Sequence, residues 1–225
     1  MPGKAWADTT DLQESALAQP ITGPYRFDVA ARMAQTVAEG PRIEPLDDAE
    51  MTPEVREICD RVRAGAGAGP AAIVPEYMRT MARHPALFEA QMEIGAMLYN
   101  GLIPPREREL AILRIGWLAG APYEWGEHVR ISQRVGVTPE EVERATNGSD
   151  ADGWSEHEAA ILRGVEELLA DFAISDRTWA TLAKSWNEAQ MLEFPSMVGQ
   201  YVATAYIQNS VRSRLGEGNP GLTHR

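Results

Sequence analysis

Apolar residues recur along most of the chain at the three- and four-residue spacing of helices, and Pro, Gly and capping residues separate these segments. Thr52 before Pro53 indicates a helix start, and its apolar positions continue to Val62. Capping boxes beginning at Thr138 and Ser155 predict two more helices. Strand signals are weak everywhere, so the pattern predicts an all-α fold. The remaining predicted helices cover 76–83, 86–99, 104–118, 122–136 and 187–214, the last kinked at Pro195.

Two segments without clear periodicity flank this helical region. Residues 1–40 carry several Pro and Gly residues and predict an arm that packs late, is exchanged with a partner, or stays loose. Residues 41–215 form the predicted helical domain, and residues 216–225 are expected to be a loose tail. A chain of 225 residues fits one domain with such an arm.

The segment Leu110–Leu118 is apolar nearly all round, and Arg114 is its only charged residue. A helix that is apolar on every side is normally buried. Glu109 lies three residues before Ile112 and seven before Gly116, so its side of the helix runs into the core. A carboxylate there is desolvated unless it is paired, and desolvation predicts a raised pKa.

The next helix places a histidine on an apolar stripe. His128 lies three residues after Trp125 and three before Ile131. Glu124 precedes it by four residues, so the two side chains can touch on one helix face. A histidine with a carboxylate in reach is a candidate general acid or base. The alternatives are a core histidine with its hydrogen bonds satisfied, or an ordinary surface pair.

Composition narrows the possible partners. The chain has 33 acidic and 21 basic residues, for a net charge of −12, which disfavours nucleic acid and anionic membrane surfaces. No apolar run approaches the roughly 18 residues of a transmembrane helix, and the first residues lack the apolar centre of a signal peptide. We therefore expect a soluble, cytoplasmic protein. The single cysteine, Cys59, excludes an internal disulfide.

Four short sequence segments, or phrases, resemble motifs of one known family: Pro105–Leu110, Tyr123–His128, Gly153–Ser155 and Gly199–Tyr201. The chain resembles the carboxymuconolactone decarboxylase family, which also contains the alkyl hydroperoxidase D proteins, over most of its length. The resemblance implies an all-α helical bundle of the alkyl hydroperoxidase D type. It also implies a homo-oligomer, which could be a dimer, trimer or hexamer.

The hydroperoxidase branch of this family carries Cys-x-x-Cys-x-x-x-His on one helix and a glutamate on the helix before it. The resemblance places the histidine at His128 and the glutamate at Glu109, but it places the two cysteines at Ala121 and Glu124. Thiol–disulfide chemistry needs a thiolate and a resolving thiol. Ala121 and Glu124 provide no thiol, and Cys59 lies far away in sequence. We therefore do not expect a thiol peroxidase.

What remains resembles the decarboxylase side of the family, where a cofactor-free site removes carbon dioxide from a cyclic, unsaturated lactone acid. Such a site must stabilise an oxyanion and protonate carbon. The resemblance implies that His128 is the proton donor or base and that Glu109 orients it. Glu124 would be a second carboxylate, and Tyr123 would supply a hydroxyl donor near the substrate.

Two further residues are candidates for substrate binding. Arg114 could hold the carboxylate of a small carboxylated substrate, and Trp125 could form a wall of the pocket. No metal is predicted, because zinc sites usually show more His or Cys than Glu109, Glu124 and His128 provide. Isomerase, hydratase or retro-aldol chemistry at the same residues stays open, as does a non-catalytic, ligand-binding oligomer.

Overall fold

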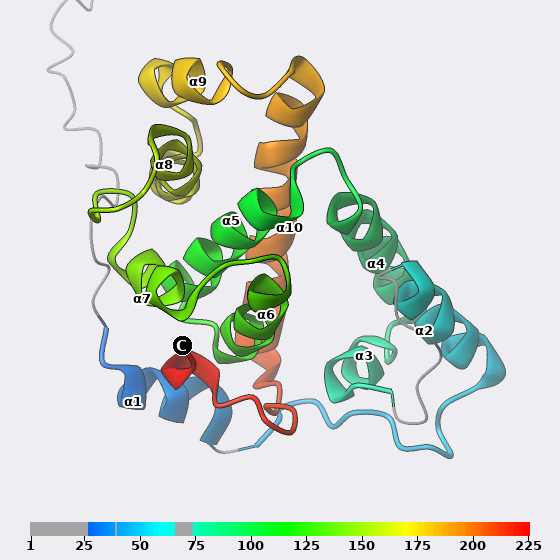
Figure 1. The fold of residues 1–225 in the computed structure, drawn as a ribbon. Helices are drawn as coiled ribbons and strands as arrows, with labels where there is room; N and C mark the ends of the chain where they lie inside the picture. The colour runs from blue at the N-terminus through cyan, green and yellow to red at the C-terminus, as the bar shows by residue number, and fades with distance from the viewer. Residues whose placement is uncertain (1–26, 39, 66–73) are drawn as a thin grey trace, which may run out of the picture.

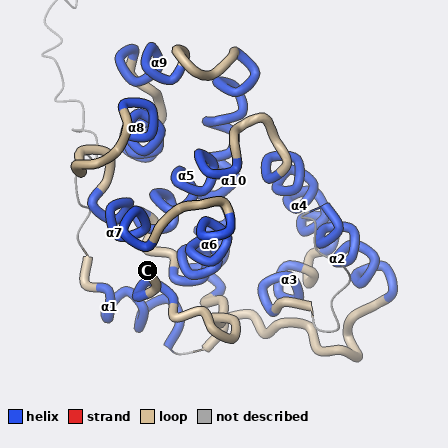
Figure 2. The backbone as a smooth tube through the Cα atoms, viewed as in Figure 1, coloured by secondary structure: helices blue, strands red, loops and turns tan. Residues whose placement is uncertain are grey.

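The computed structural model describes residues 27–38, 40–65 and 74–225, and all regular structure in these ranges is helical (Figure 2). This confirms the all-α prediction. No helix among the described residues is long and apolar enough to cross a membrane. The elements are α1 (Val29–Met33), the π-helix η1 (Ala34–Ala38), α2 (Pro53–Gly65), α3 (Glu76–Met81), α4 (Pro85–Tyr99), α5 (Pro105–Leu118), α6 (Pro122–Arg134), α7 (Pro139–Asn147), α8 (Glu156–Asp171), α9 (Asp176–Leu182), α10 (Glu188–Val211) and the 3₁₀ helix η2 (Gly221–Thr223).

Local capping explains where several helices begin. Thr138 and Ser155 form the predicted capping boxes of α7 and α8. Asn187 forms another at the start of α10, which continues as a helix through Pro195. The sequence analysis did not identify α9, which is short and starts where the Ser175 side chain accepts a hydrogen bond from a backbone N–H.

Helix α5 lies at the centre of the fold, between the group α8–α9 and the helices α6 and α7 (Figure 1). Every residue from Arg108 to Leu118 is buried, as the apolar pattern predicts. Ala111 and Ile115 pack into a core with α8 and α10, whereas Leu110 and Leu113 pack into a second core with α6 and α7. The central helix therefore has fixed neighbours on both sides.

A glycine allows α5 and α6 to approach each other closely. A Cβ atom at Gly116 would lie 3.4 Å from the backbone of Trp125. The turn between the helices contains Gly120 with φ +51°, a conformation that glycine adopts without steric cost. The hairpin consequently holds α5 and α6 at a fixed separation, which matters for the residues they share.

Helices α2, α3 and α4 form a separate group at one side of the molecule (Figure 1). This group has its own core, which includes Val55, Cys59, Tyr77 and Phe88. Among its helices, α4 also packs against α10. The two parts of the fold therefore meet along α4 and α10.

Segments from both flanks of the helical domain pack on the α5–α6 pair. Arg32 of α1 donates hydrogen bonds to the backbone oxygens of Gly120 and Ala119, each at 2.9 Å. The ring of Phe27 lies 5.0 Å from that of Trp117. Residues 27–38 of the expected arm thus pack on this same chain, while residues 1–26 lie outside the described part.

The segment 216–225 is packed, which differs from the loose tail expected from its sequence. Leu222 is fully buried in the core formed with α5, α6 and α7. Trp125 Nε1 donates a hydrogen bond to the backbone oxygen of His224 at 2.9 Å. Asn219 adds hydrogen bonds to the backbone oxygen of Tyr123 and to Glu127, so tertiary contacts hold a segment whose sequence has no helical period.

Replacing Leu222 by Ala should therefore destabilise the protein by about 2–4 kcal/mol, since it removes a buried side chain and leaves a cavity. Urea unfolding of wild type and variant measures this difference. Leu192→Ala is the matched control, because Leu192 is 71% exposed and its loss should cost no more than about 0.5 kcal/mol. Equal effects of the two substitutions would contradict the packed segment.

Candidate active site

A pocket of about 230 Å³ lies where α4, α6 and α10 meet, with one residue of α3 at its edge. Pockets that hold drug-sized ligands usually measure roughly 300–1,000 Å³, so this one suits a smaller molecule. Its lining residues are Tyr77, Met92, Gly95, Ala96, Tyr99, Tyr123, Glu124, Glu127, His128, Gln200, Tyr201, Thr204 and Gln208.

His128 stands between two carboxylates in this pocket. Its Nδ1 atom lies 2.7 Å from Oε2 of Glu109, which comes from the neighbouring helix α5. Its Nε2 atom lies 3.5 Å from Oε1 of Glu124, one turn earlier on α6. Glu109 lies behind the histidine and does not line the pocket, whereas Glu124 does. The structure thus brings together three of the predicted residues, with Nε2 on the pocket side.

Arg108 pairs with Glu109, which does not line the pocket. Its guanidinium group contacts Oε1 of Glu109 through Nε at 3.0 Å and Nη2 at 2.9 Å. It also donates a hydrogen bond to the backbone oxygen of Tyr99 and stacks over the Tyr99 ring, 4.1 Å from its centroid. Arg108 therefore connects the buried carboxylate to a residue of the pocket wall.

The pKa values of these groups follow from burial and pairing. Burial alone would raise the pKa of Glu109, but His128 and Arg108 outweigh it and lower that pKa. This differs from the upward shift expected for an unpaired carboxylate. Burial would lower the pKa of His128, yet Glu109 and Glu124 raise it. Glu124 itself has a raised pKa, because burial outweighs the attraction of His128.

Tyrosine and glutamine side chains surround the histidine. The ring of Tyr201 meets His128 edge-on, with the centroids 5.3 Å apart. The predicted Tyr123 lines the pocket, and its ring packs 5.7 Å from that of Tyr77. Burial raises the pKa of Tyr123 and Tyr201, so both hydroxyls stay protonated and can donate. Gln208 also lines the pocket, and its side chain partly offsets the effect of burial on the pKa of Glu124.

The sequence profile of the carboxymuconolactone decarboxylase family matches residues 85–167. The matched range contains Glu109, Glu124 and His128, and it runs from α4 through most of α8. Residues 85–167, which hold the candidate site, are therefore similar to the carboxymuconolactone decarboxylase family. The resemblance drawn from the sequence is thereby confirmed, and this chain has Ala121 and Glu124 where the hydroperoxidase branch has its cysteines.

Solved structures show the same fold in relatives of low sequence identity. A peroxidase-related protein with an alkylhydroperoxidase AhpD core, from Ralstonia eutropha JMP134, has a TM-score of 0.65 at 18% identity, covering 79% of this chain and 93% of that one. The debrominase Bmp8 has a TM-score of 0.63 at 18% identity, covering 78% and 92%. A peroxidase-related protein from Silicibacter sp. TM1040 has a TM-score of 0.64 at 13% identity, covering 80% and 95%. No curated protein matches the sequence.

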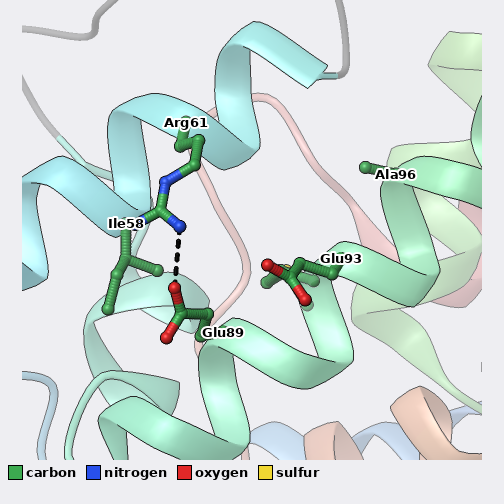
Figure 3. Close-up of a pocket in the computed structure, with 6 residues that line it drawn as sticks. Ile58, Arg61, Glu89, Glu93 and Ala96 are labelled. Carbon is green, nitrogen blue, oxygen red and sulfur yellow. Dashed lines mark hydrogen bonds and ion pairs between the residues drawn. The ribbon is translucent and has the colours of Figure 1, made fainter.

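Two other potential sites lack an activated acid, base or nucleophile. A groove of about 200 Å³ between α2 and α4 contains the exposed ion pair Arg61–Glu89, with Glu93 nearby and no histidine (Figure 3). Cys59 is buried, and burial together with Asp60 raises its pKa, the opposite of an activated thiol. In the described ranges, no three His, Cys, Asp or Glu side chains are placed to hold a metal ion.

Arg114 does not line the pocket, in contrast to the substrate-binding position expected from the sequence. It is fully buried on another side of α5, where its Nε donates to Glu166 Oε1 at 2.8 Å. It also donates to the backbone oxygens of Ala145 and Thr146. The guanidinium group joins α5 to α7 and α8, which is a structural role within residues 85–167.

Trp125 is not a pocket wall either. It is fully buried in the core with Trp117 and Leu222, on a different side of α6 from the pocket. The aromatic walls come instead from Tyr77, Tyr99 and Tyr201, none of which the sequence analysis assigned to the site. Tyr201 lies in one of the phrases of the family resemblance, which is the one signal that could have found it.

The buried Arg114–Glu166 pair makes a clear prediction about stability. Arg114→Met should destabilise the protein by about 3–5 kcal/mol, because it leaves Glu166 buried without its cation. Chemical unfolding measures this, and adding Glu166→Leu should restore much of the loss. Arg163→Met, which breaks an exposed pair with Asp150, should cost no more than about 1 kcal/mol. A stable Arg114→Met protein that has lost only ligand binding would contradict the structural role.

The pairing of Glu109 with His128 predicts how the histidine titrates. In Glu109→Gln the pKa of His128 should fall, since the main charge that favours the imidazolium is gone. Proton NMR of the histidine ring measures it directly, with His128→Ala used to assign the signal. Glu107→Gln is the control, because Glu107 contacts Trp186 and His157 instead. An unchanged His128 titration in Glu109→Gln would show that the pair does not form.

Proposed function

We propose that the protein is an enzyme in which His128 transfers a proton at a carbon next to a carbonyl group, in a reaction of the lyase or isomerase type. One observation carries this proposal: an imidazole fixed at Nδ1 by a buried carboxylate presents Nε2 to a small pocket. The hydrogen bond at Nδ1 fixes the orientation of the ring and favours its protonated form. Such a group is a general acid or base, and proton transfer by it contributes about 10²–10⁴-fold to a rate.

Glu124 supports a reaction that moves a proton between two atoms. It lies 3.5 Å from His128 Nε2, and its raised pKa favours the protonated form. Two titratable groups with differently shifted pKa values can divide the acid and base roles between them. An isomerase or a lyase needs both roles, because a proton leaves one atom and arrives at another.

The tyrosines support stabilisation of the intermediate. Removing a proton next to a carbonyl creates an enolate, whose oxygen needs hydrogen-bond donors. Tyr123 and Tyr201 line the pocket and stay protonated. The Tyr201 ring also touches the His128 ring, which makes Tyr201 our first candidate for the donor to that oxyanion.

Decarboxylation, the reaction expected from the sequence, has weaker support. Its substrate carries a carboxylate, and Arg114, the expected partner for that group, is enclosed elsewhere. The remaining support is the family match. The fold also serves other chemistry, since the structural neighbour Bmp8 is a debrominase with a variant solved in complex with 2,3,4-tribromopyrrole, a ring without a carboxylate.

A test of proton transfer does not require the natural substrate. Wild type should catalyse exchange of deuterium from solvent into the carbon next to the carbonyl of some members of a panel of ring ketones, lactones and β-keto acids, followed by NMR. His128→Ala should lose at least about 100-fold of that rate, since it removes the acid/base group. Carbon dioxide release, measured on the same panel, separates decarboxylation from exchange alone.

His157→Ala is the matched control, because His157 also lies near a glutamate, 3.3 Å from Glu107, but outside the pocket. It should exchange at the wild-type rate. Equal exchange by wild type and His128→Ala would exclude a catalytic His128. Exchange on no member of the panel would favour the non-catalytic, ligand-binding alternative.

A further inference from the structure

The pocket offers a bound anion no basic side chain. None of its described lining residues is a Lys or an Arg. The nearby guanidinium groups are already engaged: Arg108 with Glu109 and the Tyr99 backbone, and Arg130 with Glu127. A carboxylate moved from water into this pocket would lose its hydration without gaining a cation, which is costly.

The imidazolium form of His128 does not supply the missing cation. Its charge is balanced by Glu109 at 2.7 Å and faces Glu124 at 3.5 Å. A substrate carboxylate would therefore compete with the carboxylate of Glu109 for one positive group. Like charges at such distances disfavour binding of an anion.

The pocket is no better suited to a cation. Glu127 is already paired with Arg130 at 2.5 Å and accepts a hydrogen bond from Asn219 at 2.9 Å. Burial favours the uncharged form of Glu124. An ammonium group near that carboxyl would also meet the imidazolium of His128, so a cation gains little from the acidic residues here.

Two polar atoms in the lining, Oη of Tyr77 and Oε1 of Gln208, are buried without a hydrogen-bond partner. Gln208 is the more deeply placed of the two acceptor candidates in the lining: it is 3% exposed, and its Oε1 atom can only accept a hydrogen bond. A buried acceptor without a partner costs free energy, and a ligand that donates a hydrogen bond would recover it. Around Gln208, the rings of Tyr77, Tyr99 and Tyr201 offer flat apolar surfaces.

We infer that the pocket takes uncharged, single-ring compounds that donate a hydrogen bond, through a hydroxyl or N–H group, to Oε1 of Gln208. The inference names the substrate class of the proposed acid/base site and so rests on the proposed function. It differs from the carboxylated substrate expected from the sequence. The small volume, the tyrosine walls and the absence of Lys and Arg from the described lining all select for such a ring.

Three matched probes test this by isothermal titration calorimetry near neutral pH: para-hydroxybenzyl alcohol, para-hydroxybenzoate and para-hydroxybenzylamine. They share one ring and one hydroxyl and differ in charge. The alcohol should bind at least about tenfold more tightly than either charged probe. Gln208→Met should weaken binding of the alcohol by about tenfold, because the acceptor is lost.

Gln91→Met is the matched control. Gln91 is also a buried glutamine, 8% exposed with an unpartnered Oε1, but it does not line the pocket, so this variant should bind like wild type. Tightest binding of the benzoate or of the amine would overturn the inference. So would an equal loss in the two glutamine variants, or Kd values above about 10 mM for all three probes. Because binding needs no turnover, selective binding of the alcohol without proton exchange would overturn the proposed function alone.

Discussion

The site depends on keeping one carboxylate charged in the middle of the protein. Glu109 has no exposure to solvent, and a buried carboxylate is costly unless charged or hydrogen-bonded groups surround it. Arg108 binds one of its oxygens and His128 the other. These contacts require α5 and α6 to lie in one register, so the electrostatic need of Glu109 fixes the orientation of the histidine that faces the pocket.

The sequence predicts the positions of Glu109, Glu124 and His128. The apolar run after Leu110 predicts a buried helix, and the spacing of Glu109 places it on a core-facing side. The i,i+4 relation of Glu124 and His128 predicts their contact, which the structure has at 3.5 Å. In contrast, Arg114 follows Glu109 by five residues, about 140° around an α-helix. Helix geometry alone therefore places the side chains of Arg114 and Glu109 on different sides of α5.

Other parts of the site could not be predicted from local pattern. Glu124 and Trp125 flank His128 on its two sides, and spacing does not tell which side faces a pocket and which faces a core. Tyr99, Tyr201 and Gln208 come from other helices, so their arrival at His128 depends on how α4 and α10 pack. The packing partners of Leu222 lie on α5 and α6. Residues 216–225 have no helical periodicity from which these contacts could be predicted. Tertiary packing decides these cases, and it also determines the charge that the pocket accepts.

The way segments from both flanks support the α5–α6 hairpin has a consequence for folding kinetics. Glu109 and His128 are separated by 19 residues, so their contact closes a short loop and costs little chain entropy. The supporting hydrogen bonds close much longer loops: Arg32 reaches Ala119 across 87 residues, and Trp125 reaches His224 across 99. Contacts of such high sequence separation slow folding. The acid/base pair thus belongs to a local, fast-forming unit, whereas the rigidity around it is acquired with the slow, long-range closure of the chain.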